Sequence, residues 1–160
     1  MSNQSQTLFQ ALAKFLFALT LIGVVLTLKF VFTDQLGEFT YQGLENDVLF
    51  YRLALAAIGF CALVSSWSYT FAGFCKSCSN AGKLVKGLPL GQMGHGFYLV
   101  LFGIALVRHD SQIVLAGMFV AAAIHLVLVA LLVRWRVFCA TCFLVAISAI
   151  FTCVVLLLRA

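Results

Sequence analysis

Five long apolar stretches constrain the fold of this 160-residue chain more than any other feature. Each is about 20 residues long, the length with which one helix crosses a hydrocarbon core of about 30 Å. Lipid offers the backbone no hydrogen-bond partners, so segments of this kind form helices rather than open strands. The sequence therefore predicts an all-α integral membrane protein with five transmembrane helices, at Leu12–Phe32, Leu49–Phe71, Leu88–Val107, Gln112–Val133 and Val137–Leu158.

Charged side chains are too scarce for a soluble protein. They make up 9% of the chain, and hydrophobic residues make up 64%, against about 25% and about 45–50% in soluble domains. This composition excludes a water-facing globular domain, and it also excludes a nucleic-acid binder despite the net charge of +5. We expect residues 1–160 to form a single integral membrane domain surrounded by lipid.

The charges are distributed unevenly among the predicted connections. Thr33–Val48 carries acids and no Lys or Arg, whereas Ala72–Lys86 carries three lysines and no acid. Arg134 and Arg136 lie between the fourth and fifth helices. Under the positive-inside rule, this bias places the N-terminus, the lysine-bearing connection and the two arginines in the cytoplasm.

Four of the six cysteines form two C-x-x-C pairs. Cys75 and Cys78 lie in the lysine-bearing connection, and Cys139 and Cys142 open the last predicted helix. Two crossings separate the pairs, so both pairs are expected on the same membrane face. A helix N-terminus lowers the pKa of a thiol there, and Arg136 adds positive charge nearby. Two dithiols on one face suit an electron relay by thiol–disulfide exchange.

The two remaining cysteines have no partner at this spacing. Cys61 and Cys153 fall in the middle of predicted helices, where a thiol commonly serves as a small hydrophobic side chain. We expect them to be structural.

The order of these features resembles the vitamin K epoxide reductase family and its functional relatives, the DsbB-type quinone-linked disulfide-forming proteins. A loop pair ends in Cys78, and a Gly-Leu-Pro-Leu-Gly segment, Gly87–Gly91, follows and opens a helix. Another helix comes next, and the last one begins with the second pair and continues as Phe143–Ala146. The resemblance covers 49–158 and implies a four-helix core, to which 1–48 adds a helix and an acidic connection.

The resemblance also implies a function and a mechanism. The protein would be a membrane thiol–disulfide oxidoreductase in which Cys75 and Cys78 exchange with a thioredoxin-like or other thiol protein. Cys78 would then exchange with Cys139, and Cys142 would pass electrons to a bound quinone. It further implies a bacterial inner membrane with the cysteines facing outward, whereas the charge bias places them in the cytoplasm.

Two histidines are candidates for quinone binding. His125 lies near the middle of the fourth helix, where an ionisable residue is rare and often functional. It could hydrogen-bond a quinone carbonyl or accept a quinone proton; the structural alternative is a neutral imidazole bonded to a neighbouring helix carbonyl. His95 is the second candidate, as a base or ligand. Glycines and polar residues dilute the beginning of its helix, which leaves a start near Gly96, with Gly87–His95 at the interface, as an alternative.

Two other functions remain open from the sequence. The thiolates of Cys75, Cys78, Cys139 and Cys142 could together bind or transport Zn²⁺ or another soft metal ion, for which sulfur ligands are favoured. The chain could also be a small accessory subunit of a larger membrane complex, packed through its first helix and its phenylalanine-rich faces.

Overall fold

A computed structural model describes the chain at residues 3–33, 45–71, 90–108, 111–136 and 138–159. All the regular structure in these ranges is helical, and each helix contains a segment long and apolar enough to cross a membrane. The prediction of an all-α membrane protein with five transmembrane helices is therefore confirmed. Within the described residues the helices are α1 (Asn3–Phe32), α3 (Glu45–Thr70), α5 (Leu90–Arg108), α6 (Ser111–Arg134) and α7 (Ala140–Arg159).

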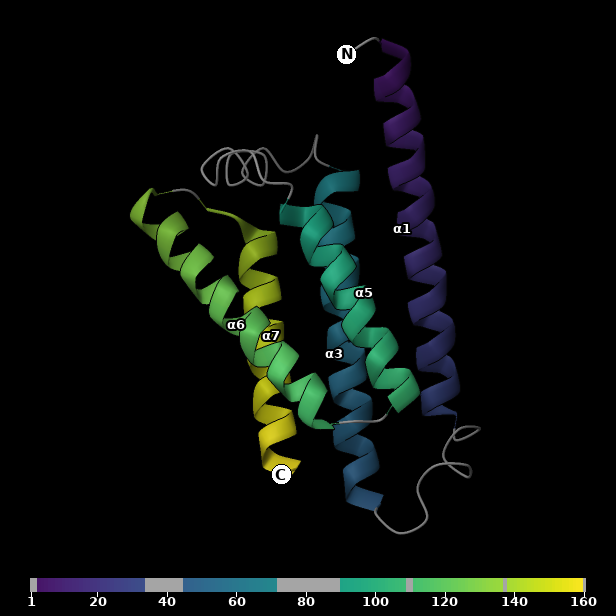
Figure 1. The fold of residues 1–160 in the computed structure, drawn as a ribbon, viewed down its shortest axis with the longest axis vertical. Coiled ribbons are helices and arrows are strands. Elements are labelled where there is room, and N and C mark those ends of the chain that lie inside the picture. The colour runs from purple at the N-terminus through teal and green to yellow at the C-terminus, as the bar shows by residue number, and fades with distance from the viewer. Residues whose placement is uncertain (1–2, 34–44, 72–89, 109–110, 137, 160) are drawn as a thin grey trace.

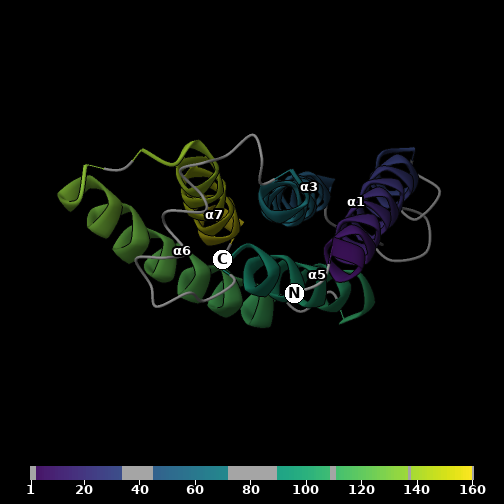
Figure 2. The same ribbon diagram turned by 90° about the horizontal axis from the view of Figure 1, so that it is seen from above.

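The helices run alternately up and down, with α3 at the centre of the bundle (Figure 1). Viewed from above, α3 lies between α1 and α7, and α6 forms the outer edge next to α7 (Figure 2). Contacts agree with these views, since α3 packs against α1, α5 and α7, while α6 packs chiefly against α7. The end of α3, the start of α5 and the start of α7 all lie at one end of the bundle (Figure 1).

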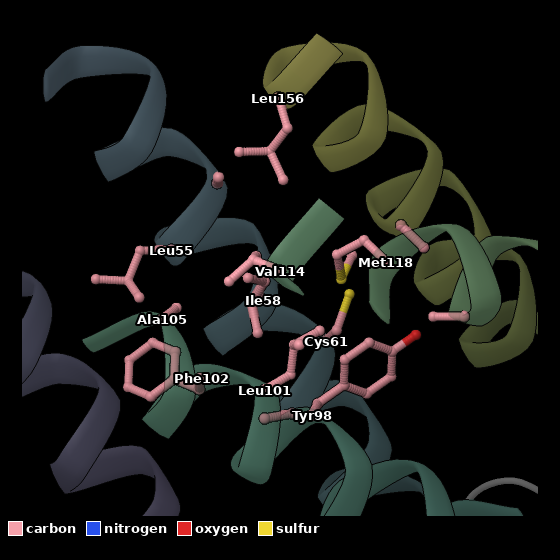
Figure 3. Packing of buried hydrophobic residues seen from close by; sticks show 14 of the residues in the cluster. Leu55, Ile58, Cys61, Tyr98, Leu101, Phe102, Ala105, Val114, Met118 and Leu156 are labelled. Atoms are coloured by element: carbon pink, nitrogen blue, oxygen red, sulfur yellow. The ribbon is translucent and has the colours of Figure 1, made fainter. Parts of the chain in front are cut away.

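A continuous apolar core fills the space between the helices (Figure 3). Ile58 of α3 and Met118 of α6 have no exposed surface, and Leu156 of α7 is buried beside them. Large apolar side chains also cover the outer faces, such as Ile22 on α1 at 55% exposed and Ile147 on α7 at 62%. Such a surface is a liability in water but suits contact with lipid. A membrane environment thus accounts for the apolar residues both in the core and on the outer surface.

Helix α1 packs closely along α3. Phe17 meets the rings of Trp67 and Phe71 edge-on, with centroids 5.7 and 5.5 Å apart. A Cβ on Gly59 would lie 2.9 Å from Val24 Cγ1, so a larger residue there would push α1 away. The additional N-terminal helix is therefore part of the packed bundle.

The start of α5 differs from one expectation. It begins at Leu90, so the alternative start near Gly96 is wrong, and His95 is a buried residue in the second turn of the helix. The physical reason is close packing against α3: a Cβ on Gly91 would collide with the Ser68 hydroxyl, and one on Gly94 would lie 3.3 Å from Ser65 Oγ. These glycines allow two helices to approach, a common role of small residues in membranes.

Candidate functional site

The two thiols at the start of α7 are in direct contact. Their Sγ atoms lie 2.8 Å apart, and both cysteines are free thiols. This separation exceeds the S–S bond length of about 2.05 Å, so the contact is a hydrogen bond between thiols. The Thr141 hydroxyl lies 3.2 Å from Cys139 Sγ. Three polar side chains therefore meet in the first turn of the helix: Cys139, Thr141 and Cys142.

Cys139 occupies the N-cap position of α7. The helix begins at Ala140, and the Cys139 carbonyl accepts the first intrahelical hydrogen bond from the Phe143 N–H at 3.2 Å. An N-cap side chain can accept from the unpaired N–H groups of the second and third helical residues, which are Thr141 and Cys142. A thiolate at this position is therefore held by backbone donors that nothing else in the helix can use.

The hydrogen-bond donors around Cys139 together lower the pKa of its thiol from 9.0 to about 6. The largest cause is the hydrogen bond that the Cys142 S–H donates to the thiolate; burial opposes it, and the Thr141 hydroxyl and the two backbone N–H groups assist it. Such a pKa leaves Cys139 mostly deprotonated at neutral pH, and the thiolate is the reactive form of cysteine. The site thus contains an activated thiolate with a second thiol within bonding reach.

Cys139 is covered despite this activation. It has no exposed surface, and Leu132 of α6 packs over it and over the partly buried Cys142. Phe138, 71% exposed, stacks on Phe143 beside the pair, with ring centroids 5.4 Å apart. Cys139 is therefore covered by apolar side chains, whereas Cys142 is only partly buried.

The loop pair, Cys75 and Cys78, lies outside the described residues. The helix ends that flank it, the end of α3 and the start of α5, lie at the same end of the bundle as the start of α7 (Figure 1). The expected exchange between Cys78 and Cys139 stays a prediction. A four-cysteine metal site also stays a prediction, because it needs the loop pair; among the described residues, no group of three or more His, Cys, Asp or Glu side chains is placed to hold a metal ion.

His95 joins three helices through both ring nitrogens. Thr20 of α1 donates its hydroxyl hydrogen to the Leu16 carbonyl at 2.8 Å, so its oxygen accepts from His95 Nε2–H at 2.9 Å. His95 Nδ1 then carries a lone pair and accepts from the Tyr69 hydroxyl of α3 at 2.7 Å. The imidazole is neutral with a defined tautomer. It connects α1, α3 and α5, and neither nitrogen is left to serve as a base or to bind a ligand.

His125 is bonded differently. It is half-buried on α6, and its Nδ1 lies 2.8 Å from the carbonyl of Ala121, one turn earlier in the same helix. The Tyr98 hydroxyl of α5 lies 3.5 Å from the same nitrogen. The carbonyl that binds this imidazole thus belongs to its own helix and not to a neighbouring one.

A buried hydroxyl–thiol network was missed by the sequence analysis. Tyr98 has no exposed surface, and its hydroxyl bonds to the Cys61 thiol, which also bonds to Ser148 of α7. Cys153 lies close enough to interact electrostatically with Tyr98. The available signal was the presence of Tyr and Ser within apolar helices, because a hydroxyl in hydrocarbon requires a partner.

No protein-family model matches this chain, and neither a curated protein nor a solved structure matches it. The chemistry of the site therefore rests on the thiols, hydroxyls and imidazoles described above.

Proposed function

We propose that this protein is a membrane thiol–disulfide oxidoreductase whose redox-active pair is Cys139 and Cys142. The observation that carries the proposal is the 2.8 Å contact between the two Sγ atoms at the N-cap of α7, where Cys139 has a pKa of about 6. A thiolate and a thiol at this distance form a disulfide by losing two electrons and one proton. The same thiolate can attack a disulfide sulfur on another residue, which is the elementary step of exchange.

The loop pair is the proposed link to a thiol protein. Because Cys139 has no exposed surface, a soluble thioredoxin-like or other thiol protein exchanges with Cys75 and Cys78 rather than with Cys139 directly. Cys78 then exchanges with Cys139, as the family resemblance implies. The covered position of Cys139 favours this order, since it protects the activated thiolate from unrelated disulfides.

A quinone is the proposed electron acceptor or donor. Cys142 lies within the membrane-spanning segment Ala140–Leu158, whereas Cys139 precedes it. Cys142 is therefore the member of the pair nearer to the hydrocarbon, where lipid-soluble quinones reside. The same proposal implies a bacterial inner membrane, with the side of the cysteines to be determined by labelling of sealed vesicles.

The test uses the full chain, purified anaerobically in lipid. Free thiols, metal and quinone are measured first, and thiols are counted again after a soluble quinone analogue is added. We expect the quinone to oxidise both thiols of the Cys139–Cys142 pair to a disulfide. We also expect Cys142→Ala to lose dithiol-driven quinone reduction. The matched control, Cys61→Ala, removes a thiol from the middle of the bundle. Wild-type rates in Cys142→Ala, or stoichiometric Zn²⁺ that protects four thiols, would contradict the proposal.

A further inference from the structure

His125 has one ring nitrogen in use and one available. Its Nδ1 lies 2.8 Å from the Ala121 carbonyl oxygen, and since a carbonyl can only accept, Nδ1 carries the hydrogen. A neutral imidazole with a protonated Nδ1 has its lone pair on Nε2. No other described residue hydrogen-bonds to that Nε2. His95, by contrast, uses both nitrogens in bonds to Thr20 and Tyr69.

The ring that carries the available nitrogen lies on α6 beside α5, with its centroid 6.1 Å from that of Tyr98. His125 is half-buried, and the side chains on either side of it in the chain, Ile124 and Leu126, are 53% and 52% exposed. These exposed neighbours face lipid in a membrane-spanning helix. A charged imidazole is costly at this depth, and an unpaired acceptor in hydrocarbon is costly as well. The position therefore favours a ligand that enters from the lipid and donates a hydrogen bond.

The same face of α6 leads to the dithiol. Leu132 follows His125 by seven residues, or two helical turns, and packs against Cys139 and Cys142. At 1.5 Å per residue the axial separation is about 10 Å. The distance between the two oxygens of a quinone, plus one contact distance from each oxygen to a protein atom, is of this size. Along the axis of α6, His125 is therefore about one ring length from Leu132, the residue that packs on the dithiol.

We propose that His125 Nε2 accepts a hydrogen bond from the hydroxyl of a membrane-soluble hydroquinone, so that the site binds hydroquinone more tightly than quinone. The inference rests on the proposed function. A quinone carbonyl only accepts, and facing the lone pair of Nε2 it gains no hydrogen bond. A hydroquinone hydroxyl donates and satisfies the imidazole. The polarity of one hydrogen bond therefore discriminates between the two oxidation states.

This preference biases electron flow toward the quinone. Tighter binding of the reduced form makes the bound quinone a stronger oxidant, and a tenfold preference corresponds to about 30 mV for a two-electron couple. The Cys139 thiolate and the Cys142 thiol then form a disulfide, releasing two electrons and one proton. The quinone takes up both electrons, that proton and a second proton from water. Electrons thus flow from the thiols to the quinone.

The test compares the affinities of a soluble hydroquinone and its quinone for the full chain in lipid under anaerobic conditions. Cys142→Ser is used as the background, so that no turnover occurs. We expect the hydroquinone to bind about tenfold more tightly, as one added hydrogen bond to an acceptor that has no other partner implies. His125→Leu abolishes this preference by weakening hydroquinone binding. His125→Gln reduces it by improving quinone binding, because an amide can also donate. Leu126→Val is the lipid-facing control and leaves both affinities unchanged.

The outcomes separate the two proposals. This inference is overturned if hydroquinone and quinone bind equally well to the Cys142→Ser protein that retains His125. It is also overturned if the preference for hydroquinone persists after His125→Leu. The proposed function survives either result as long as the wild-type protein still reduces quinone with thiols. If neither ligand binds and no thiol-dependent reduction occurs, the proposed function and this inference both fail. His125→Gln retains a polar side chain, so it keeps the test valid if His125→Leu does not fold.

Discussion

The first turn of α7 and the middle of the bundle hold the same side chain in two different chemical settings. Cys139 and Cys142 touch at 2.8 Å, and Cys139 also receives N–H groups from the helix start. Cys61 lies in the bundle interior with no exposed surface, bonded to the neutral hydroxyls of Tyr98 and Ser148. Only the first setting supplies both a stabilised thiolate and a second thiol. The helix terminus and the partner thiol, rather than burial, therefore distinguish the proposed redox pair from the interior cysteines.

The largest expected effect comes from removing the partner thiol. In Cys142→Ala the principal donor to the Cys139 thiolate is lost while burial remains, so the pKa of Cys139 rises from about 6 toward its ordinary value of 9.0. The ultraviolet absorbance of the thiolate, followed against pH in lipid, measures the midpoint. A midpoint that stays near 6 would mean that Cys142 does not activate Cys139.

The lowered pKa of Cys139 also makes the stability of the fold depend on pH. The pKa of Cys139 is lowered in the folded state, so the contribution of its thiolate to stability is complete above about pH 9 and is lost as the pH falls through about 6. In wild type the fraction of reactive thiolate falls over the same acid range. Cys142→Ala shifts the loss of thiolate to higher pH.

A second expected effect concerns the contact of α1, α3 and α5 around His95. His95→Leu removes the acceptor for Tyr69 and the donor to Thr20, which leaves polar groups unpaired among α1, α3 and α5. We expect a lower thermal midpoint, equivalent to about 2–3 kcal/mol. The pH midpoint of Cys139 should stay near 6. His95→Gln, which can still donate to one hydroxyl, should lose less stability. A shifted thiolate midpoint in His95→Leu would show that the two regions are coupled.

A smaller effect is expected within the dithiol turn itself. Thr141→Val removes one hydroxyl that stabilises the Cys139 thiolate but keeps the shape of the side chain. The pKa of Cys139 should rise, by less than in Cys142→Ala, since the thiol of Cys142 is the stronger donor. The same absorbance titration measures both variants. If Thr141→Val raised the midpoint more than Cys142→Ala, the hydroxyl would be the principal donor.

Hydropathy predicted the helices well because lipid permits few other structures. The observed spans Gln112–Arg134 and Ala140–Leu158 lie within a few residues of the predicted ones. The ends were less predictable: α1 extends back to Asn3 and α3 to Glu45, because a helix continues its own hydrogen bonds through polar residues beyond the apolar segment. Hydropathy does not register those turns.

The candidate site was predictable only where its residues are close in the sequence. The C-x-x-C spacing identified Cys139 and Cys142, since residues three apart meet within one helical turn. The partners of His95 were not predicted, because Thr20 and Tyr69 lie 75 and 26 residues away and belong to other helices. Whether both ring nitrogens of a histidine have hydrogen-bond partners depends on tertiary packing. The sequence pattern therefore did not show that His95 uses both nitrogens and His125 only one.

The smallest effect is expected from the thiols of the bundle interior. Cys61→Ala and Cys153→Ala each remove one sulfur from the core without touching the turn at Cys139. The loss of a small side chain leaves a modest cavity, and Tyr98 loses one hydrogen-bond partner in Cys61→Ala. We therefore expect a destabilisation of about 1 kcal/mol. Dithiol-driven quinone reduction should proceed at close to the wild-type rate in both variants, measured beside Cys142→Ala. Cys61→Ser is the sharper control, because its hydroxyl can still bond to Tyr98 and Ser148 while it cannot form a disulfide. Loss of turnover in Cys61→Ser with the fold intact would mean that the interior thiol takes part in electron transfer. The proposed difference in role between the α7 pair and the interior cysteines would then be wrong.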